Sequence, residues 1–261
     1  MPGRSIPVVT YHHISPAGRG LTISPEIFED HLRVLDKKGW KTLSGEEFLF
    51  FLQRDEIPKK CVLLSFDDGF ADNYIYAYPI LKKYNMKALL FVATSFIEEK
   101  GRERNNFIPL SHREAWPLAF TERRSEVMCT WDELKEMERN RVFDIQSHGH
   151  THRIPQYFKE DKYQEIREDL IISKKTLEEK LSKVVSHLAW PKGNYNQRGI
   201  IIATEVGFKA LYTTERGPNT NKNLKMLKRL PVKRRDGRWL LRRLAIYSSG
   251  LLSKLYLSVR I

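Results

Sequence analysis

Cysteine is nearly absent from this chain of 261 residues. Only Cys61 and Cys129 occur, and their separation is not the spacing of a cysteine metal site. The sequence therefore gives no indication of a disulfide framework or of a cysteine-based zinc site. Cys61 opens an apolar run, so we expect it to be a small buried residue.

Long apolar runs are also missing. No stretch approaches the roughly 18 consecutive apolar residues that indicate a membrane-spanning helix. Near the N-terminus, the apolar run 8–10 is too short for the core of a signal peptide. We expect a cytoplasmic location, with peripheral contact at the inner face of the membrane.

Acidic residues are too few to balance the basic ones. The chain has 32 Asp and Glu against 45 Lys and Arg, which gives a formal net charge of +13. This charge favours contact with anionic lipid, acidic glycan or nucleic acid, and does not choose among them.

Since 41% of the residues are hydrophobic, the composition is typical of a folded protein. We divide the chain into a catalytic domain, 1–232, and a basic C-terminal segment, 233–261.

Short apolar runs alternate with amphipathic helical patterns along the catalytic domain. The runs expected to form strands are 6–10, 61–66, 88–93, 142–146, 187–190 and 210–213. Repeated β/α units of this kind predict an α/β barrel or a parallel sheet. Between the strands, Ser44 with Glu47 and Thr130 with Glu133 have the spacing of a helix capping box.

The segment 98–128 interrupts this alternation. It is polar and irregular, and it follows the end of an expected strand, where barrels place functional loops. Two interpretations stay open for it: a solvated insertion, or a lid that faces the substrate.

Two adjacent carboxylates end the strand expected at 61–66. Asp67 and Asp68 precede Gly69, and adjacent side chains at a strand end can point in different directions. One carboxylate could therefore bind a metal ion while the other contacts a water molecule beside it. An Asp-Asp-Gly sequence also makes ordinary turns, so by itself it does not indicate a metal site.

Three histidines follow the strand expected at 142–146. Imidazole nitrogens suit zinc and related ions, and His148 and His152 have the recurrent His-x-x-x-His ligand spacing. With one of the two carboxylates they would form a three-ligand site that leaves room for water and substrate. His150 could be a further ligand, but the alternation at a strand end favours its facing elsewhere, and we leave it out.

Residues 65–69 (Ser-Phe-Asp-Asp-Gly) and 147–152 together resemble two motifs of the polysaccharide deacetylase family, the NodB-homology carbohydrate esterases. The resemblance covers most of residues 6–232 and is weakest in 98–128. It implies a distorted (β/α) barrel of about seven strands. It also implies Asp67 as the catalytic base and the metal ligands Asp68, His148 and His152. From the ligand type, zinc is the default ion, and cobalt or nickel would bind such a site comparably well.

A third family motif, Arg-x-Pro-aromatic-Gly, resembles residues 189–193 here. The substrate-binding residues expected from this region are Trp190, Pro191, Lys192 and Tyr195. Trp190 and Tyr195 could offer aromatic faces to a sugar ring, or could simply pack in the core. The family's arginine, which tethers the base, is replaced by Ala189, so another group must orient Asp67.

The family's C-terminal Leu-x-His, which supplies the general acid, has no match in 227–232. The N-terminal segment Tyr11-His12, however, is similar to that of the poly-N-acetylglucosamine deacetylases. In that branch the strand order is circularly permuted, and the histidine after the tyrosine supplies the acid. The resemblance implies His12 as the general acid, and the alternative is a strand-end histidine of no special role.

These motifs predict a metal-dependent hydrolase that removes the N-acetyl group from an N-acetylated sugar and releases acetate. The substrate would be a polysaccharide, a lipopolysaccharide or a lipid-linked glycan. The alternative is another C–N or ester hydrolase, such as a deformylase, cyclic amidase or O-deacetylase, because the motifs do not fix the acyl group. A non-catalytic protein that binds nucleic acid or glycan is a third interpretation. Retention of the base and ligands disfavours it, and we expect no specific nucleic-acid partner.

The segment 233–261 contains eight Lys or Arg residues and one acidic residue, interleaved with Trp239 and several leucines. Such a segment can lie in the headgroup region of an anionic membrane. A C-terminal helix that packs on the barrel and exposes a basic face is the other interpretation.

Overall fold

The computed structural model describes residues 3–18, 20–99, 104–233 and 235–259. Parts of the expected 98–128 insertion and of the 233–261 segment, at 100–103, 234 and 260–261, lie outside the described residues.

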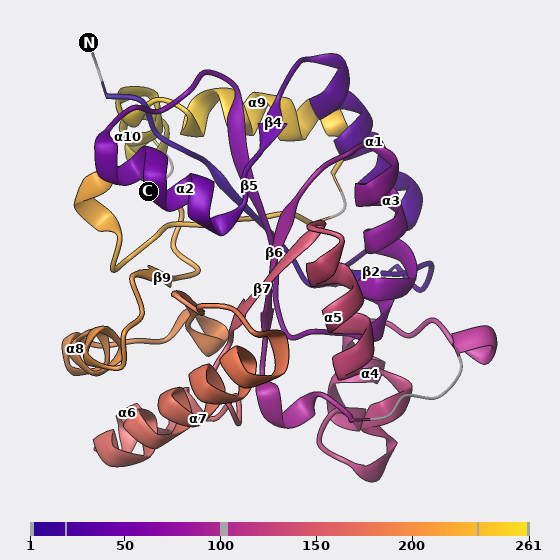
Figure 1. The fold of residues 1–261 in the computed structure, drawn as a ribbon. Coiled ribbons are helices and arrows are strands. Elements are labelled where there is room, and N and C mark those ends of the chain that lie inside the picture. The colour runs from indigo at the N-terminus through magenta and orange to yellow at the C-terminus, as the bar shows by residue number, and fades with distance from the viewer. Residues whose placement is uncertain (1–2, 19, 100–103, 234, 260–261) are drawn as a thin grey trace.

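A curled parallel sheet forms the centre of the molecule (Figure 1), with seven strands in the order β10-β1-β5-β6-β7-β8-β9. The strands are β1 Val8–Tyr11, β5 Cys61–Phe66, β6 Ala88–Val92, β7 Phe143–Ser147, β8 His187–Ala189, β9 Ala210–Tyr212 and β10 Leu230–Pro231. The N-terminal strand β1 lies between β5 and the last strand, β10. The predicted distorted barrel of about seven strands is confirmed.

The six expected strands are all present, with ends within two residues of those predicted. The strands that the sequence did not indicate are β2 His13–Ile14, β3 Thr22–Ile23, β4 Lys41–Thr42 and β10. Each contains only two residues, so no apolar run or alternation marks it.

Helices surround the sheet (Figure 1). They are α1 Pro25–Lys37, α2 Gly45–Arg54, α3 Tyr78–Lys83, α4 His112–Leu118, α5 Trp131–Arg139, α6 Ile154–Lys159, α7 Tyr163–Leu181, α8 Gln197–Glu205, α9 Gly237–Tyr247 and α10 Gly250–Ser258. Both predicted capping boxes are confirmed. The Ser44 hydroxyl accepts from the Glu47 backbone N–H at the start of α2, and Thr130 and Glu133 do the same for α5.

The insertion 98–128 packs on the carboxyl end of the sheet. It contains α4 and a short 3-10 helix, Glu122–Glu126. Its buried apolar residues form a small cluster with side chains that follow β5 and β6. The cluster contains Phe70, Ala93, Phe96, Ala115, Ala119, Val127 and Met128. The described part of the insertion is therefore a packed wall of the molecule.

The C-terminal segment contains two helices with different surroundings. In α9, Leu240 and Leu244 are buried in the main core, and the Gly237 N–H donates to Asp30 of α1 over 2.7 Å. In α10, Leu251, Leu252 and Leu255 are about half exposed. The packed-helix interpretation therefore holds for α9, whereas α10 presents apolar side chains to solvent. No described helix combines the length and apolarity that a bilayer span needs.

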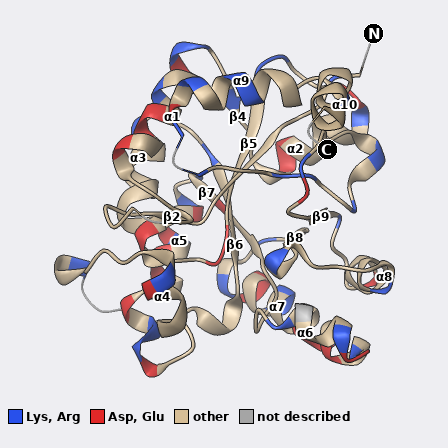
Figure 2. Cartoon of the chain, turned by 180° about the vertical axis from the view of Figure 1, so that it is seen from behind, with Lys and Arg blue, Asp and Glu red and all other residues tan. Residues whose placement is uncertain are grey.

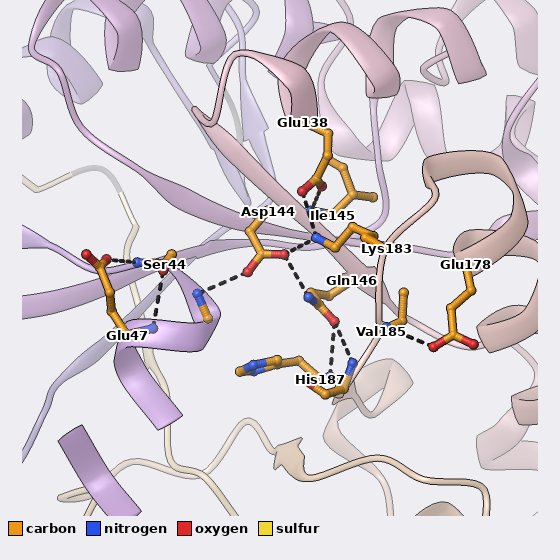
Figure 3. A network of polar contacts seen from close by, with 12 residues as sticks. Ser44, Glu47, Glu138, Asp144, Ile145, Gln146, Glu178, Lys183, Val185 and His187 are labelled. Carbon is orange, nitrogen blue, oxygen red and sulfur yellow. Dashed lines mark hydrogen bonds and ion pairs between the residues drawn. The ribbon is translucent and has the colours of Figure 1, made fainter. Parts of the chain in front are cut away.

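A partly buried polar network joins helices to the amino end of β7 (Figure 3). The Asp144 carboxylate accepts hydrogen bonds from the Gly45 N–H (3.0 Å), the Gln146 amide (2.7 Å) and the Lys183 ammonium. Lys183 also pairs with Glu138 of α5 at 2.8 Å. A Cβ at Gly45 would lie 2.6 Å from Asp144, so only glycine allows this approach. The network therefore fixes α2 and α5 relative to the sheet.

We expect Lys183→Met to destabilise the protein by about 3 kcal/mol, because it leaves two carboxylates without their shared cation. The melting temperature should fall by about 6–12 °C in thermal unfolding followed by circular dichroism. Lys175→Met is the control, since Lys175 is exposed and lies 3.8 Å from Glu179. Equal shifts in the two variants would contradict the structural role of the network.

Candidate metal centre

The candidate site lies at the carboxyl ends of β5 and β7, which flank β6 in the sheet. Asp67 and Asp68 directly follow β5. His148 directly follows β7, and His152 comes four residues later. Carboxyl ends of parallel strands meet at one edge, so residues 80 positions apart in sequence become neighbours there. The three predicted ligands are all buried.

The three predicted ligands form a compact triad. Asp68 Oδ1 lies 3.5 Å from His148 Nε2 and 3.5 Å from His152 Nε2. These distances are long for hydrogen bonds. They match the separation of about 3.4 Å between two ligand atoms that bind the same tetrahedral ion through bonds of about 2.1 Å. Burial alone would raise the pKa of Asp68, but the neighbouring imidazoles hold it well below its usual range. The donors therefore fit a divalent ion in charge, chemistry and spacing.

The ring of His148 is fixed by the neighbouring strand. Its Nδ1 donates a hydrogen bond of 2.8 Å to the carbonyl oxygen of Ala189, at the end of β8. The proton is thereby held on Nδ1, and the lone pair of Nε2 faces Asp68. Ala189 thus supports the triad through its backbone, even though it lacks the arginine side chain of the family motif.

Two of the three ligands have unusual backbone conformations. Asp68 has φ = 78° and His152 has φ = 59°, in the left-handed region that few residues other than glycine adopt. The adjacent Gly69 has φ = 84°, and a Cβ there would lie 2.9 Å from Val92. Such conformations persist only where the surrounding structure imposes them, and they concentrate at functional sites.

The turn that carries His152 is anchored by a carboxylate from α7. Asp169 accepts hydrogen bonds from the backbone N–H groups of His150 (2.6 Å) and Thr151 (2.9 Å). The His150 ring bonds with Thr94 Oγ1 at 2.8 Å, and His150 is not part of the triad. Sequence reasoning missed Asp169. The available signal was an acidic residue on the buried face of α7, beside Ile166 and Leu170.

Asp67 is paired with an arginine that sequence reasoning also missed. Arg229 Nη1 lies 2.6 Å from Asp67 Oδ1, and Arg229 Nε donates to the carbonyl oxygen of Thr213. Burial alone would raise the pKa of Asp67, but the Arg229 guanidinium, together with His148 and His12, outweighs this effect and lowers the pKa. The available signal was the segment 227–229, Leu-Lys-Arg, which has an arginine where the family motif has its histidine.

His12 lies on the other side of Asp67. Its Nε2 is 3.9 Å from Asp67 Oδ2, and its side chain is 23% exposed. Burial lowers the pKa of His12, and the carboxylates of Asp67 and Asp68 oppose this shift. The Asn73 amide holds the His12 backbone through a hydrogen bond of 2.8 Å to its carbonyl oxygen. The structure therefore brings His12, Asp67 and the triad together at one edge of the sheet.

The segment expected to bind substrate follows β8, next to the Ala189 carbonyl that holds His148. Trp190 is fully buried and packs against Phe158, so its ring has no surface open to a sugar in this conformation. Pro191 is buried beside it, and Lys192 is exposed with φ = 57°. Tyr195 is partly exposed, and its hydroxyl donates to Glu215 over 2.8 Å.

The insertion contributes a wall that the sequence did not assign to individual residues. The Trp116 and His152 rings pack edge to face, with ring centroids 4.8 Å apart. His112 stacks on Trp116 at 5.6 Å and lies 6.0 Å from the His12 ring. Both residues belong to α4. The described part of the insertion thus faces the site, as the lid interpretation requires.

Comparison with known proteins identifies relatives of the whole domain. The family model described as polysaccharide deacetylase matches residues 54–211. YxkH of Bacillus subtilis (strain 168), provisionally named a polysaccharide deacetylase, is 30% identical over 213 residues, or 81% of this chain and 65% of that protein. The poly-β-1,6-N-acetyl-D-glucosamine N-deacetylase of Staphylococcus aureus (strain MSSA476) is 27% identical over 78% of this chain and 66% of its own length. The chain thus spans about two thirds of the length of these relatives.

A solved structure extends this likeness to three dimensions. The Streptococcus pyogenes deacetylase PplD, in complex with acetate, is 28% identical to this chain and superimposes with a TM-score of 0.75. The match covers 92% of this chain and 98% of PplD.

We expect the metal-free protein to bind one Zn²⁺ or Co²⁺ per chain in isothermal titration calorimetry. His152→Ala should weaken this binding by at least about 100-fold, because it removes one of three ligands from the triad. His150→Ala is the matched control from the same turn, since its ring bonds with Thr94 instead. Equal losses in both variants would contradict the ligand assignment.

Proposed function

Because the chain belongs to the polysaccharide deacetylase family, we propose that it is a metal-dependent hydrolase that removes the acetyl group from an N-acetylated sugar. The observation that carries the proposal is the position of Asp67, with Arg229 at 2.6 Å on one oxygen and His12 at 3.9 Å from the other, next to the triad. This arrangement provides a base, an acid candidate and a metal centre within one site.

The relatives favour a glucosamine-type substrate. The Staphylococcus aureus relative is named for poly-β-1,6-N-acetyl-D-glucosamine, and the PplD structure contains acetate, the product of deacetylation. We therefore propose an N-acetylglucosamine unit of a polysaccharide, lipopolysaccharide or lipid-linked glycan as the substrate class. Zinc is the default ion from the ligand set, and cobalt or nickel would also fit it.

The geometry supports a simple division of work. Asp68, His148 and His152 would hold a divalent ion, which would supply Lewis acidity for activating water and polarising the acetyl carbonyl. Asp67, held ionised by Arg229, accepts a proton from the water that attacks the carbonyl carbon. When the C–N bond breaks, His12 protonates the sugar nitrogen, and acetate and a free amine leave.

The turn after β8 supplies the other side of the site in this proposal. The backbone N–H of Lys192 is our candidate donor to the oxyanion that forms on the acetyl carbonyl. Pro191 and Tyr195 would flank the sugar beside it. Trp190 lies beneath this turn, so contact between its ring and a sugar requires the turn to move.

The experiment that tests this function is acetate release from N-acetylated glycans and lipid-linked sugars, with chelated enzyme and added zinc, cobalt or nickel. We expect no acetate without metal and restored release with it. Metal binding without acetate release from any substrate would overturn the proposal. It would then favour another C–N or ester bond as the target.

Asp67→Asn separates the two roles of the paired carboxylates and serves as the inactive control in that experiment. It should lower kcat by at least about 100-fold, because it removes the base, while one metal ion still binds. Loss of metal in Asp67→Asn would contradict the assignment of Asp68 as the ligand and Asp67 as the base.

We also propose that α10 contacts an anionic membrane. Leu251, Leu252 and Leu255 are 52%, 51% and 55% exposed, and exposed Lys254 and Arg242 lie in the same segment. Apolar side chains beside basic ones suit the headgroup region of anionic lipid. Figures 1 and 2 show α9 and α10 at the end of the molecule opposite α4, so the metal triad would face away from that membrane.

The triple change Leu251→Ser, Leu252→Ser and Leu255→Ser should weaken sedimentation with phosphatidylglycerol vesicles at least about tenfold, since it removes the apolar contact. Ile171→Ser with Ile172→Ser is the control, because these residues are also exposed but lie on α7. The membrane proposal would be overturned if the wild-type protein did not sediment with the vesicles and instead formed a dimer through α10.

A further inference from the structure

A second buried acid–histidine pair lies beside the site and has no part in the chemistry described above. His13 Nδ1 is 2.6 Å from Asp72 Oδ2, and the two residues are 1% and 3% exposed. Asp72 lies four residues after Asp68, and His13 directly follows His12. Neither residue belongs to the triad, so the pair needs another explanation.

The pair continues into the wall that the insertion forms. His13 Nε2 lies 3.1 Å from Nδ1 of His112, the first residue of α4. Three side chains, separated by up to 99 positions in sequence, thus form one hydrogen-bonded chain from the interior to the surface of the site. His112 stacks on Trp116, which in turn contacts the ligand His152.

We assign the order of donors and acceptors along this chain from its buried end. One oxygen of Asp72 accepts from the Asn73 amide at 2.9 Å, and the other accepts from His13 Nδ1. One proton lies between His13 Nε2 and His112 Nδ1, and our assignment places it on His112, whose Nδ1 then donates to His13. The Nε2 of His112 is left with a bare lone pair in this arrangement.

Further observations support this state of His112. Burial lowers the pKa of His112 to about 4, so the ring is neutral near pH 7. Among the described residues, no group forms a hydrogen bond with His112 Nε2. A fully buried nitrogen without a partner would count among the unsatisfied buried polar atoms, and His112 Nε2 is not one of them. The residue itself is half-buried. Its Nε2 therefore reaches accessible space.

We propose that His112 binds the glycan, with Nε2 accepting a hydrogen bond from a hydroxyl or amide N–H group of the sugar. Asp72 and His13 are positioning residues that fix which nitrogen of His112 accepts. A bare lone pair favours sugars that present a donor at this position and rejects those that present a carboxylate or phosphate oxygen there. This inference rests on the proposed function, because it names a specificity-determining residue of the same site.

The arrangement can be tested without any substrate. In protein labelled with ¹⁵N-histidine, long-range ¹⁵N–¹H correlation spectra at pH 7 should show His112 protonated on Nδ1 and bare on Nε2. Asp72→Asn should reverse this pattern, because Asn73 still donates to the oxygen of residue 72 and the new NH₂ group then faces His13. A wild-type His112 protonated on Nε2 would overturn the inference. Asp36→Asn, on the exposed face of α1, is the matched control.

Kinetics then test the role in binding. With a substrate from which the wild-type enzyme releases acetate, His112→Ala should raise KM about tenfold or more, with a smaller change in kcat and unchanged metal stoichiometry. His112→Gln should recover part of the loss, because its amide oxygen can accept a hydrogen bond. Asp72→Asn should also raise KM, since it turns the acceptor into a donor.

The outcomes separate this inference from the function on which it rests. If the wild-type enzyme releases no acetate from any glycan, the proposed function fails, and the spectra still decide the arrangement of the chain. If acetate is released and His112→Ala has the KM of the wild-type enzyme, the inference alone is wrong.

Discussion

The buried ion pair between Arg229 and Asp67 connects the last strand of the sheet to the site formed by its central strands. Removing two charges from water is costly, and such a pair is stable only when its remaining hydrogen-bonding groups are also satisfied. Arg229 meets this condition by donating to the Thr213 carbonyl, and its guanidinium lies over the Phe91 ring. The orientation of Asp67 therefore depends on the path of the chain 162 positions further on.

The metal triad depends on similar support from the elements around it. His148 is oriented by the Ala189 carbonyl of the next strand, and the turn that carries His152 is held by Asp169 of α7. Asp68 and His152 both have positive φ angles, whose energetic cost the surrounding packing must offset. The positions of the ligand atoms are therefore set by the packing and hydrogen bonds of the protein around them.

Local patterns in the sequence were enough to predict six of the strands, both capping boxes and a cluster of carboxylates and histidines, and the family resemblance named the three ligands within that cluster. Asp68, His148 and His152 each follow a run that is recognisably a strand, so their meeting at one edge follows from parallel pairing. Arg229 and Asp72 could not be assigned in this way, because their partners lie 162 and 59 positions away and no local pattern records such contacts. The C-terminal segment was ambiguous for the same reason: packing on α1 buries α9, while the adjacent α10 stays exposed.

The insertion gives the site a wall whose chemistry differs from that of the triad. In the proposed function, the triad and Asp67 act on the acyl group and do not select the rest of the sugar. His112 and Trp116 come from a different part of the chain and pack against His152 without replacing it as a ligand. If His112 binds the glycan as proposed, a change in the insertion would alter which glycan is accepted while the metal centre stays intact. Because α10 lies at the other end of the molecule from α4, the proposed membrane contact would be separable from glycan selection. An extended glycan that leaves the membrane would then reach the site more readily than a sugar at the lipid surface.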